Sequence, residues 1–354
     1  WLKPLWLTGC GSAGPALQLG RRRPRGMGTL VGDGRFRLGA QAIKCRRRCW
    51  VHEGTDRATG KPVAIKLESD SARIDQLPRE RRAYQALASV AGVPRLLWSG
   101  KGEGVSIAVV ERYGPSLKTL FHHCRSRFTS RVIADIAVQA FGILERIHAK
   151  GYIHRDVRPE TLQVGLDSNL NQLHAIGLTT AKKYWHAKSE QHVPQSEEKA
   201  MMWNPIFASI NAHFGRVLSR RDDLESVGYM IAYFFRGGLP WQDIPQSMAD
   251  RHARILEGKQ RMTVEELCEG CPPQMAVYIA YCRALRFDQR PDYAYLQSLL
   301  RALDPAPAND WPTHSFEHDW TVRPALSAGE DCAEELPGDA AGEGRALAAA
   351  PAEG

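Results

Sequence analysis

The chain has 354 residues and a formal net charge of +8, with 43% hydrophobic and 24% charged residues. This length is too great for one small core and suits one large domain or two lobes, and without an apolar run of about 18 residues the chain is not expected to enter a membrane. The eight scattered cysteines exclude the dense disulfide framework of a small secreted domain, so we expect a reducing compartment, the cytoplasm or the nucleus.

The first segment, residues 1–31, is rich in Gly, Pro and Arg and has no hydrophobic periodicity. We expect it to be disordered, or to be a gene-model extension upstream of Met27. The apolar stretch from Trp1 to Leu19 is broken by a lysine, prolines and glycines, so it does not predict a secretion signal. After Met27, the start at Gly28 lacks a Ser or Thr at the position that myristoylation requires, so no lipid anchor is expected.

The next part of the chain has the pattern of an antiparallel sheet. Short strands separated by turn residues are predicted over 36–68, with a hairpin turn at Thr59-Gly60 before the apolar strand VAIKLE. A helix is predicted over 74–90, and two more strands at 94–100 and 104–111. Together these elements predict a small β-rich lobe with one helix.

From Pro115 onward the hydrophobic pattern is mainly helical. Apolar residues recur at helical spacing from Ile133 to Ile147, and Gly151 closes that helix. Further helices are predicted at 221–235, 247–257, 273–286 and 292–303. The sequence therefore predicts an α+β protein with two lobes, which we place at residues 32–113 and 114–320.

The last segment, residues 321–354, is rich in Ala, Gly and Glu and holds too little apolar surface to order itself, so we expect disorder. Residues 325–354 carry seven acids against the single base Arg345, which leaves +14 on residues 1–324. Such a basic body attracts acidic peptides, phosphates or nucleic acid. Because no nucleic-acid-binding module accompanies the charge, no specific nucleic-acid partner is expected.

One cysteine pair has the spacing of a metal site. Cys268 and Cys271 match half of a zinc knuckle. A structural zinc ion needs four ligands and no convincing second pair follows, so no zinc is expected there.

Two segments carry residues with recognisable chemistry. The strand VAIKLE presents Lys66, whose ammonium can reach nucleotide phosphates, and Glu80 on the predicted helix lies at a suitable distance along the chain to pair with it. Taken alone, such a pair is more often an ordinary surface ion pair.

The segment YIHRDVRPETL is more specific than a solvated polar loop, because His154-Arg155-Asp156 after a long apolar helix has the form of a protein-kinase catalytic loop. Asp156 would then accept the proton of a substrate hydroxyl.

Further segments make the resemblance specific to one family. They are GPSL at 114–117, ASIN at 208–211, SRRDDLESVGY at 219–229, LPWQ at 239–242 and LRFDQRPDY at 285–293. From about Gly32 to Trp320 the chain closely resembles casein kinase I, and its Ser-Ile-Asn stands where most kinases have Ala-Pro-Glu. The resemblance implies a bilobal protein-kinase fold in which Asp223 braces the backbone of the catalytic loop.

The chain departs from that family where nucleotide phosphates are held. Kinases cover the phosphates with a Gly-x-Gly-x-x-Gly hairpin, since glycine lets backbone amides approach oxygen closely. Here the stretch is AIKCRRRCWVHE, with no glycine between Gly39 and Gly54. The three arginines, 46–48, would attract anions by charge, but a solvated turn is the commoner reason for such a run.

The two positions that hold magnesium in kinases are also changed. Thr161 stands in place of the asparagine five residues after the catalytic aspartate. A gapless alignment puts Gly177-Leu178-Thr179 at the Asp-Phe-Gly motif, and alignment on Gly177 instead puts Ala175-Ile176-Gly177 there. Neither register supplies a carboxylate, so no magnesium is expected.

Substrate-facing residues differ as well. Arg158 replaces the family's lysine two residues after the catalytic aspartate, which keeps a charge without the compact ammonium. Ile206 replaces an arginine that, in the family, helps to bind phosphorylated or acidic substrates.

The resemblance and the departures together predict a casein kinase I-like pseudokinase that binds or scaffolds other proteins. In this interpretation Asp156 and Arg158 occupy the catalytic positions, and Lys66 and Glu80 bind ATP weakly without metal. The alternative is an active serine/threonine kinase with Asp156 as base, and a third hypothesis is a basic nucleic-acid-associated protein with an inherited kinase fold. We expect a monomer with protein partners or substrates.

Overall fold

Strands of the N-terminal region pair into one antiparallel sheet with the order β1-β2-β3-β4-β6-β5. The strands are β1 (Leu30–Val31), β2 (Phe36–Arg46), β3 (Cys49–Asp56), β4 (Pro62–Ser69), β5 (Leu96–Gly102) and β6 (Val105–Glu111). The computed structural model describes residues 30–46, 49–71, 76–197, 204–245 and 247–304. Among these residues β5 pairs only with β6, so it forms one edge of the sheet.

The two faces of β4 have different roles because side chains alternate along a strand. Val63, Ile65 and Leu67 are buried in a cluster with β2 and β6. Ala64 and Lys66 therefore lie on the other face, toward the second lobe. The expected turn before this strand is present, with Gly60 at φ 70 and its amide bonded to Asp56 O at 2.7 Å.

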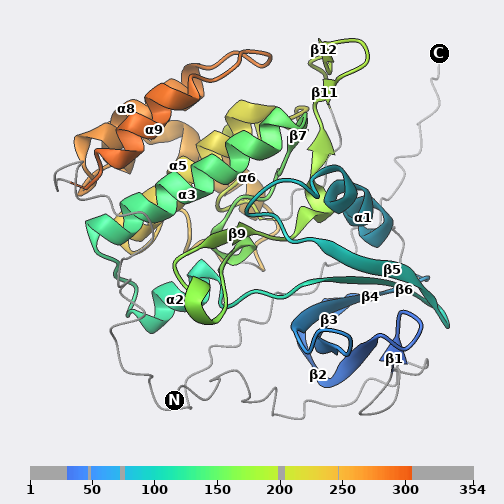
Figure 1. The fold of residues 1–354 in the computed structure, drawn as a ribbon. Helices are drawn as coiled ribbons and strands as arrows, with labels where there is room; N and C mark the ends of the chain where they lie inside the picture. The colour runs from blue at the N-terminus through green and yellow to red at the C-terminus, as the bar shows by residue number, and fades with distance from the viewer. Residues whose placement is uncertain (1–29, 47–48, 72–75, 198–203, 246, 305–354) are drawn as a thin grey trace, which may run out of the picture.

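A single helix, α1 (Gln76–Ala86), packs beside the sheet (Figure 1). Leu77, Glu80, Ala83 and Tyr84 are its buried residues, at the spacing of one helical face. The helix is shorter than the predicted span of 74–90, since residues 87–89 form a turn that leads to Gly92 at φ 88. Residues 72–75 lie outside the described part of the chain.

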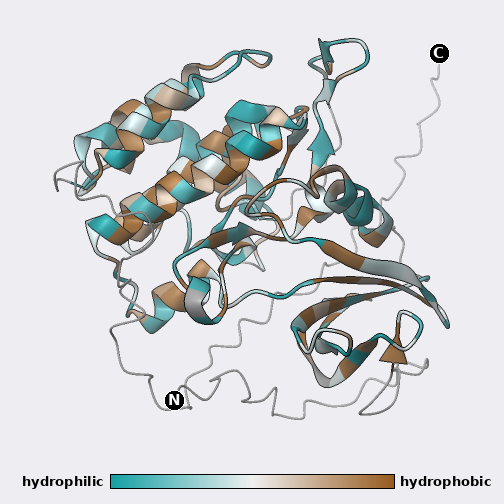
Figure 2. Ribbon diagram, in the orientation of Figure 1, coloured by the Kyte–Doolittle hydropathy of each residue, from teal (hydrophilic) through white to brown (hydrophobic). Residues whose placement is uncertain are grey.

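The second lobe is built around two long buried helices. They are α3 (Ser130–Ala149) and α5 (Arg220–Arg236), both lined by apolar residues in one large cluster (Figure 2). The other helices are α2 (Leu117–His123), α4 (Ile210–His213), α6 (Arg251–Arg261), α7 (Val264–Leu267), α8 (Pro273–Ala284) and α9 (Tyr293–Arg301). No described helix combines the length and the apolar character that crossing a bilayer requires.

The position of α6 differs from the prediction. The sequence pattern placed a helix at 247–257 and ended it before Gly258. In the structure the helix begins after Asp250 and runs through Gly258. It continues because Lys259, four residues after the buried Ile255, points into the core instead of into solvent.

Short hairpins and turns between α3 and α5 position the loops of the candidate site. β7 (Tyr152–Ile153) pairs with β10 (Lys182–Lys183), β8 (Leu162–Val164) with β9 (Leu173–Ala175), and β11 (Trp185–His186) with β12 (Gln191–His192). Three 3-10 turns accompany them at Pro159–Thr161, Asp167–Asn169 and Leu178–Thr180. The predictions for residues 1–29, for Arg47 and Arg48, and for the tail from 305 concern residues outside the described part of the chain.

Candidate functional site

Lys66 and Glu80 meet between the sheet and α1. The Lys66 ammonium forms an ion pair with Glu80 and also donates to Tyr84 Oη at 3.3 Å. Burial alone would lower the pKa of Lys66, but Glu80 and Tyr84 raise it above its usual value. The other oxygen of Glu80 accepts from the Thr179 hydroxyl at 3.2 Å. The pair is therefore held from both lobes.

A buried carboxylate supports the loop that carries Asp156. Asp223 accepts from the amides of His154 at 2.7 Å and Arg155 at 2.8 Å. It also lies 3.0 Å from Nε2 of His148. Burial favours a raised pKa for Asp223, but His148 and His154 hold that pKa below its usual value, so the carboxylate is ionised. Arg155 has φ 69, a strained conformation for a residue other than glycine, and these bonds stabilise it.

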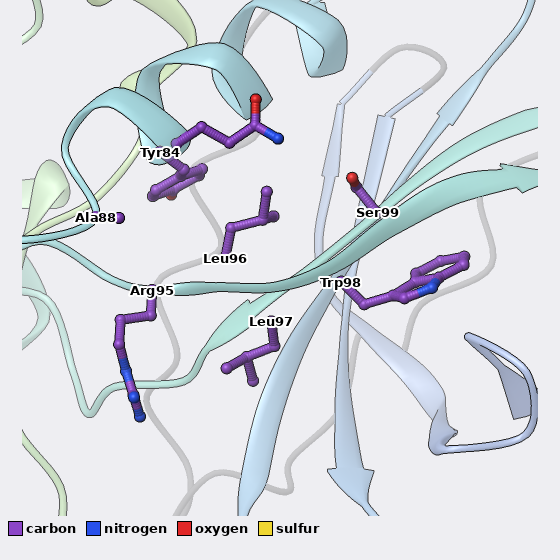
Figure 3. Close-up of a pocket in the computed structure, with 8 residues that line it drawn as sticks. Tyr84, Ala88, Arg95, Leu96, Leu97, Trp98 and Ser99 are labelled. Atoms are coloured by element: carbon purple, nitrogen blue, oxygen red, sulfur yellow. The ribbon is translucent and has the colours of Figure 1, made fainter.

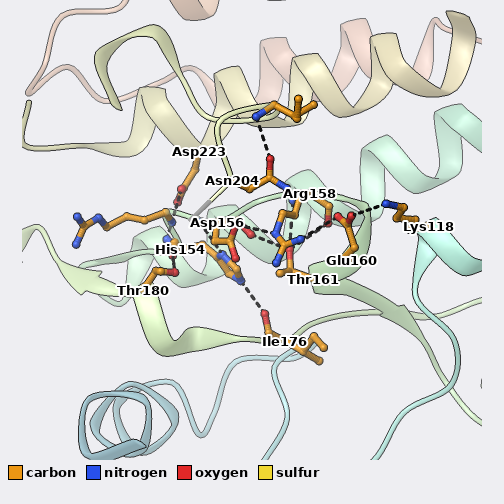
Figure 4. Close-up of polar contacts among 12 residues, drawn as sticks. Lys118, His154, Asp156, Arg158, Glu160, Thr161, Ile176, Thr180, Asn204 and Asp223 are labelled. Atoms are coloured by element: carbon orange, nitrogen blue, oxygen red, sulfur yellow. Dashed lines mark hydrogen bonds and ion pairs between the residues drawn. The ribbon is translucent and has the colours of Figure 1, made fainter. Parts of the chain in front are cut away.

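Asp156 is engaged in an ion-pair chain (Figure 4). Its Oδ1 accepts from Nε of Arg158 at 2.8 Å. Arg158 also lies 3.2 Å from Glu160, which lies 3.3 Å from Lys118 of α2. The side chains of Asp156 and Arg158 are 12% and 8% exposed, so this ion pair is shielded from solvent.

Thr161 bonds its hydroxyl to the backbone of its own loop and turns its methyl group toward Gly177. The hydroxyl donates to Asp156 O at 2.7 Å and lies 3.0 Å from Arg158 O. A Cβ atom placed on Gly177 would lie 3.5 Å from Cγ2 of Thr161. The two positions are thus neighbours, as two ligands of one metal ion would be. What they present to each other is a methyl group and a glycine Cα, neither of which is an oxygen ligand.

Gly177 begins a turn that buries the residue after it. Its φ is 77, and it caps the 3-10 turn Leu178–Thr180. Leu178 is fully buried, and Thr180 donates to His154 O at 2.9 Å. The amide of Ile176 donates to Thr161 O at 2.8 Å, which joins this turn to the loop of Asp156.

β2 and β3 extend the sheet beyond β4, on the side opposite to β6. Glu53 of β3 is paired in register with Ala64, so it faces the same side as Lys66. Glu53 forms an ion pair with Arg112, the first residue after β6. This contact ties the sheet to the chain segment that leads into the second lobe.

A buried lysine of α6, Lys259, holds the segment around Ile206 in place. Lys259 has 0% exposure and donates to Pro205 O at 2.7 Å and to Ala208 O. Trp241 donates from its indole to Ile206 O at 2.9 Å. Burial lowers the pKa of Lys259 well below its usual value.

The sequence interpretation omitted several residues of this site. Tyr84 and Thr179 complete the surroundings of Glu80, and Glu160 with Lys118 completes those of Arg158. Tyr84 had a usable signal, because it lies four residues after Glu80 on the same helical face. Thr179 had none, since its contact joins residues far apart in sequence.

Cysteine and carboxylate clusters do not form a second site. Burial raises the pKa of Cys268 to about 12 and that of Cys271 to about 11, so both thiols stay protonated near neutral pH. Within the described ranges, no group of three or more His, Cys, Asp and Glu side chains is arranged to hold a metal ion.

Comparison with known families agrees with this geometry. A family model described as protein tyrosine and serine/threonine kinase matches residues 37–300, well over half of the chain. The matched range includes Lys66, Glu80, Asp156 and Asp223.

Proposed function

Because this chain belongs to the protein tyrosine and serine/threonine kinase family, we propose that it is a casein kinase I-like pseudokinase that acts as a binding or scaffold module. Contacts between two of the casein kinase I-like segments support the subfamily. Ser209 Oγ donates to Asp222 at 2.8 Å, and Asn211 donates to the same oxygen at 3.1 Å. The Ser-Ile-Asn motif is thus fixed to the acidic start of α5.

The observation that carries the loss of catalysis is the pairing of the Thr161 methyl group with Gly177. Kinases neutralise the transferring phosphoryl group with magnesium held by an amide and a carboxylate at these positions. Here the Thr161 hydroxyl is bonded to Asp156 O, and Gly177 has no side chain. These residues do not fit a magnesium ion, and nearly all of the electrostatic stabilisation that the reaction needs is absent.

The state of Asp156 supports the same proposal. A general base must be free to accept a proton from the substrate hydroxyl. The Arg158 guanidinium donates to Asp156 at 2.8 Å, and Glu160 keeps Arg158 in place. This contact occupies Oδ1, one of the two carboxylate oxygens of Asp156.

Nucleotide binding is a separate property. Lys66 is positioned to hold a phosphate, since it is fixed by Glu80 and Tyr84. The β2–β3 hairpin has no glycine between Gly39 and Gly54 to bring backbone amides close to phosphate oxygens. We therefore propose weak, metal-independent ATP binding.

An active serine/threonine kinase is the second candidate. The intact Lys66–Glu80 pair and the support of the catalytic loop by Asp223 favour it. In that case Asp156 would accept the proton of a substrate hydroxyl, as the family mechanism requires.

Phosphate transfer to casein distinguishes the two candidates. We expect transfer by the full chain to be at least about a thousandfold below that of an active casein kinase I domain, because two metal ligands and a free base are missing. The measurement is incorporation of radioactive phosphate, made with magnesium and separately with manganese. Transfer well above that of an Asp156→Asn control with either metal would overturn the pseudokinase proposal.

The matched variant for this assay is Thr161→Asn with Gly177→Asp. Its new side chains restore the ligand types, so metal-dependent nucleotide binding should increase. Transfer should stay near background, because the hairpin still lacks its glycines and Arg158 still holds Asp156. Transfer near that of an active family member would mean that the hairpin glycines are not required here.

Thermal melting with ATP tests the nucleotide proposal. We expect millimolar ATP to raise Tm by no more than about 3 °C, and by the same amount in magnesium and in EDTA. Lys66→Ala should abolish the rise, since it removes the positioned ammonium. A shift that grows steeply with added magnesium would contradict the absence of a metal site.

A further inference from the structure

A cavity of about 430 Å³ lies between α1 and the edge strand β5 (Figure 3). The charged residue in its wall, Arg95, is already neutralised, because it lies 2.6 Å from Glu111 and also donates to it from Nε at 2.7 Å. The described residues that line this cavity include no thiol, imidazole or carboxylate. This composition distinguishes it from a second cavity, in the large lobe.

The second cavity, of about 470 Å³, adjoins a pair of cysteines. Its walls come from residues 238–240, after α5, and from Glu269 and Gly270, in the turn after α7. Those two residues lie between Cys268 and Cys271 in the sequence. A molecule in the cavity therefore contacts the turn that carries both thiols.

The turn holds the two cysteines close together. The amide of Cys271 donates to Cys268 O at 2.9 Å, and Gly270 has φ 76. A four-residue turn of this kind brings its first and last Cα atoms within about 7 Å of each other. Disulfides span Cα separations of about 4.4–6.8 Å. The backbone therefore already lies near the geometry that a disulfide requires.

Both cysteine side chains face the core of the lobe. Each is a free thiol, and Cys268 is 8% exposed within the large apolar cluster. Cys271 is half-buried and packs against the same cluster. Burial, and then the neighbouring Cys271 thiol, raise the pKa of Cys268, so the two thiols interact. Cys271 is the more accessible of the two.

A guanidinium lies beside the pair. Arg236, the last residue of α5, lines the cavity and donates to Glu269 O at 2.9 Å. Burial raises the pKa of both thiols, and the positive charge of Arg236 acts in the opposite direction on each. Arg236 therefore favours a thiolate at Cys271 and gives the cavity wall a charge that attracts anions.

From these features we infer that Cys268 and Cys271 form a reversible disulfide by exchange with a small anionic disulfide, such as glutathione disulfide, that enters the adjoining cavity. The Cys271 thiolate attacks one sulfur of glutathione disulfide, breaks its S–S bond and releases one glutathione thiolate. The Cys268 thiolate then attacks the Cys271 sulfur of the mixed disulfide and releases the second. The cysteine protons pass through solvent to the released thiolates. The cysteine pair is thus oxidised by two electrons, and glutathione disulfide is reduced to two glutathione molecules.

The exchange is slow near neutral pH, because burial keeps both thiols protonated there. The pair therefore responds to a sustained rise in the ratio of oxidised to reduced glutathione. The ring that the disulfide closes contains Glu269 and Gly270, so oxidation restrains one wall of the cavity. This chemistry is independent of the proposed loss of phosphate transfer, and the casein assay does not bear on it.

Mass spectrometry of the folded full chain tests the disulfide. The protein is incubated overnight with glutathione disulfide in excess over glutathione, and the remaining thiols are alkylated in urea. The tryptic peptide that follows Arg261 and ends at Arg283 contains Cys268, Cys271 and Cys282. We expect this peptide to lose two hydrogens and to carry one alkyl group, on Cys282. Dithiothreitol should restore both thiols.

Single variants identify the attacking thiol. Cys268→Ala leaves Cys271 without a partner, so it should retain glutathione as a mixed disulfide. Cys271→Ala should retain at least about tenfold less, because Cys268 is buried. Cys282→Ala is the matched control, since it removes a buried cysteine of the same peptide and should leave the disulfide unchanged. An unmodified chain that keeps both thiols, loss of the disulfide in Cys282→Ala, or equal retention of glutathione by Cys268→Ala and Cys271→Ala would overturn the inference.

Discussion

Replacement of Asp223 by Asn is expected to lower the free energy of unfolding by about 3 kcal/mol. The carboxylate accepts from the amides of His154 and Arg155 and contacts His148. An asparagine side chain has one acceptor oxygen, so its amide group would face at least one of these donors. Because Asp223 is 2% exposed, no solvent is available to satisfy the donor that is lost. Urea denaturation followed by circular dichroism gives the comparison.

Asp156→Asn is the control for this experiment. It weakens the ion pair with Arg158, but the guanidinium still lies 3.2 Å from Glu160, so we expect a cost of only about 1 kcal/mol. Equal denaturation midpoints for the two variants would show that Asp223 does not brace the loop. The ordering is opposite to that of an active kinase assay, in which Asp156 would be the more sensitive residue.

Lys259→Ala is expected to destabilise the protein by a similar amount, about 3 kcal/mol. The change leaves Ala208 O without its described donor, leaves Pro205 O with only His213 Nε2 at 3.1 Å, and removes a fully buried side chain that packs over the rings of Tyr229 and Trp241. Urea denaturation again provides the measurement. The segment around Ile206 should become more susceptible to proteolysis, since Lys259 donates to the carbonyl oxygens of two of its residues.

Two further variants distinguish the loss of the hydrogen bonds from the loss of the buried apolar stem of Lys259. Lys259→Met keeps most of the apolar stem but supplies no donor, so its stability should lie between those of the unmodified chain and Lys259→Ala. Lys183→Ala removes an exposed lysine and should change the midpoint little. If Lys259→Ala behaves like Lys183→Ala, the buried hydrogen bonds carry no net stability.

The fold was predictable from the sequence because its signals are local. Short strands separated by turn residues predicted the sheet, and the apolar repeat from Ile133 to Ile147 predicted α3. The boundaries were less predictable. Helix α6 continues through Gly258 because Lys259 finds carbonyl acceptors in the core, and those acceptors belong to a segment about 50 residues earlier.

The candidate site was predictable in its residue types but not in its contacts. The sequence predicted a pair of Lys66 with Glu80, and the structure contains that ion pair. Arg158 was expected only to keep a charge. Its engagement with Asp156 and Glu160 depends on how a long side chain folds within a three-dimensional loop, which no spacing rule encodes. The direction of the Thr161 methyl group could not be predicted either, because a threonine can turn either its hydroxyl or its methyl group toward a neighbour such as Gly177.

The contacts of Asp223 determine how stably the loop that carries Asp156 keeps its conformation. The amides of His154 and Arg155 are bonded to a side chain about 70 residues later, on a helix at the centre of the large lobe. We therefore expect these amides to exchange hydrogen only when the cooperative unit of α3 and α5 opens, and not by local fraying. The loop is therefore as durable as the core of the lobe. Under the pseudokinase proposal, the site would keep its shape without catalysis, since mutations that loosen the loop would also unfold the lobe.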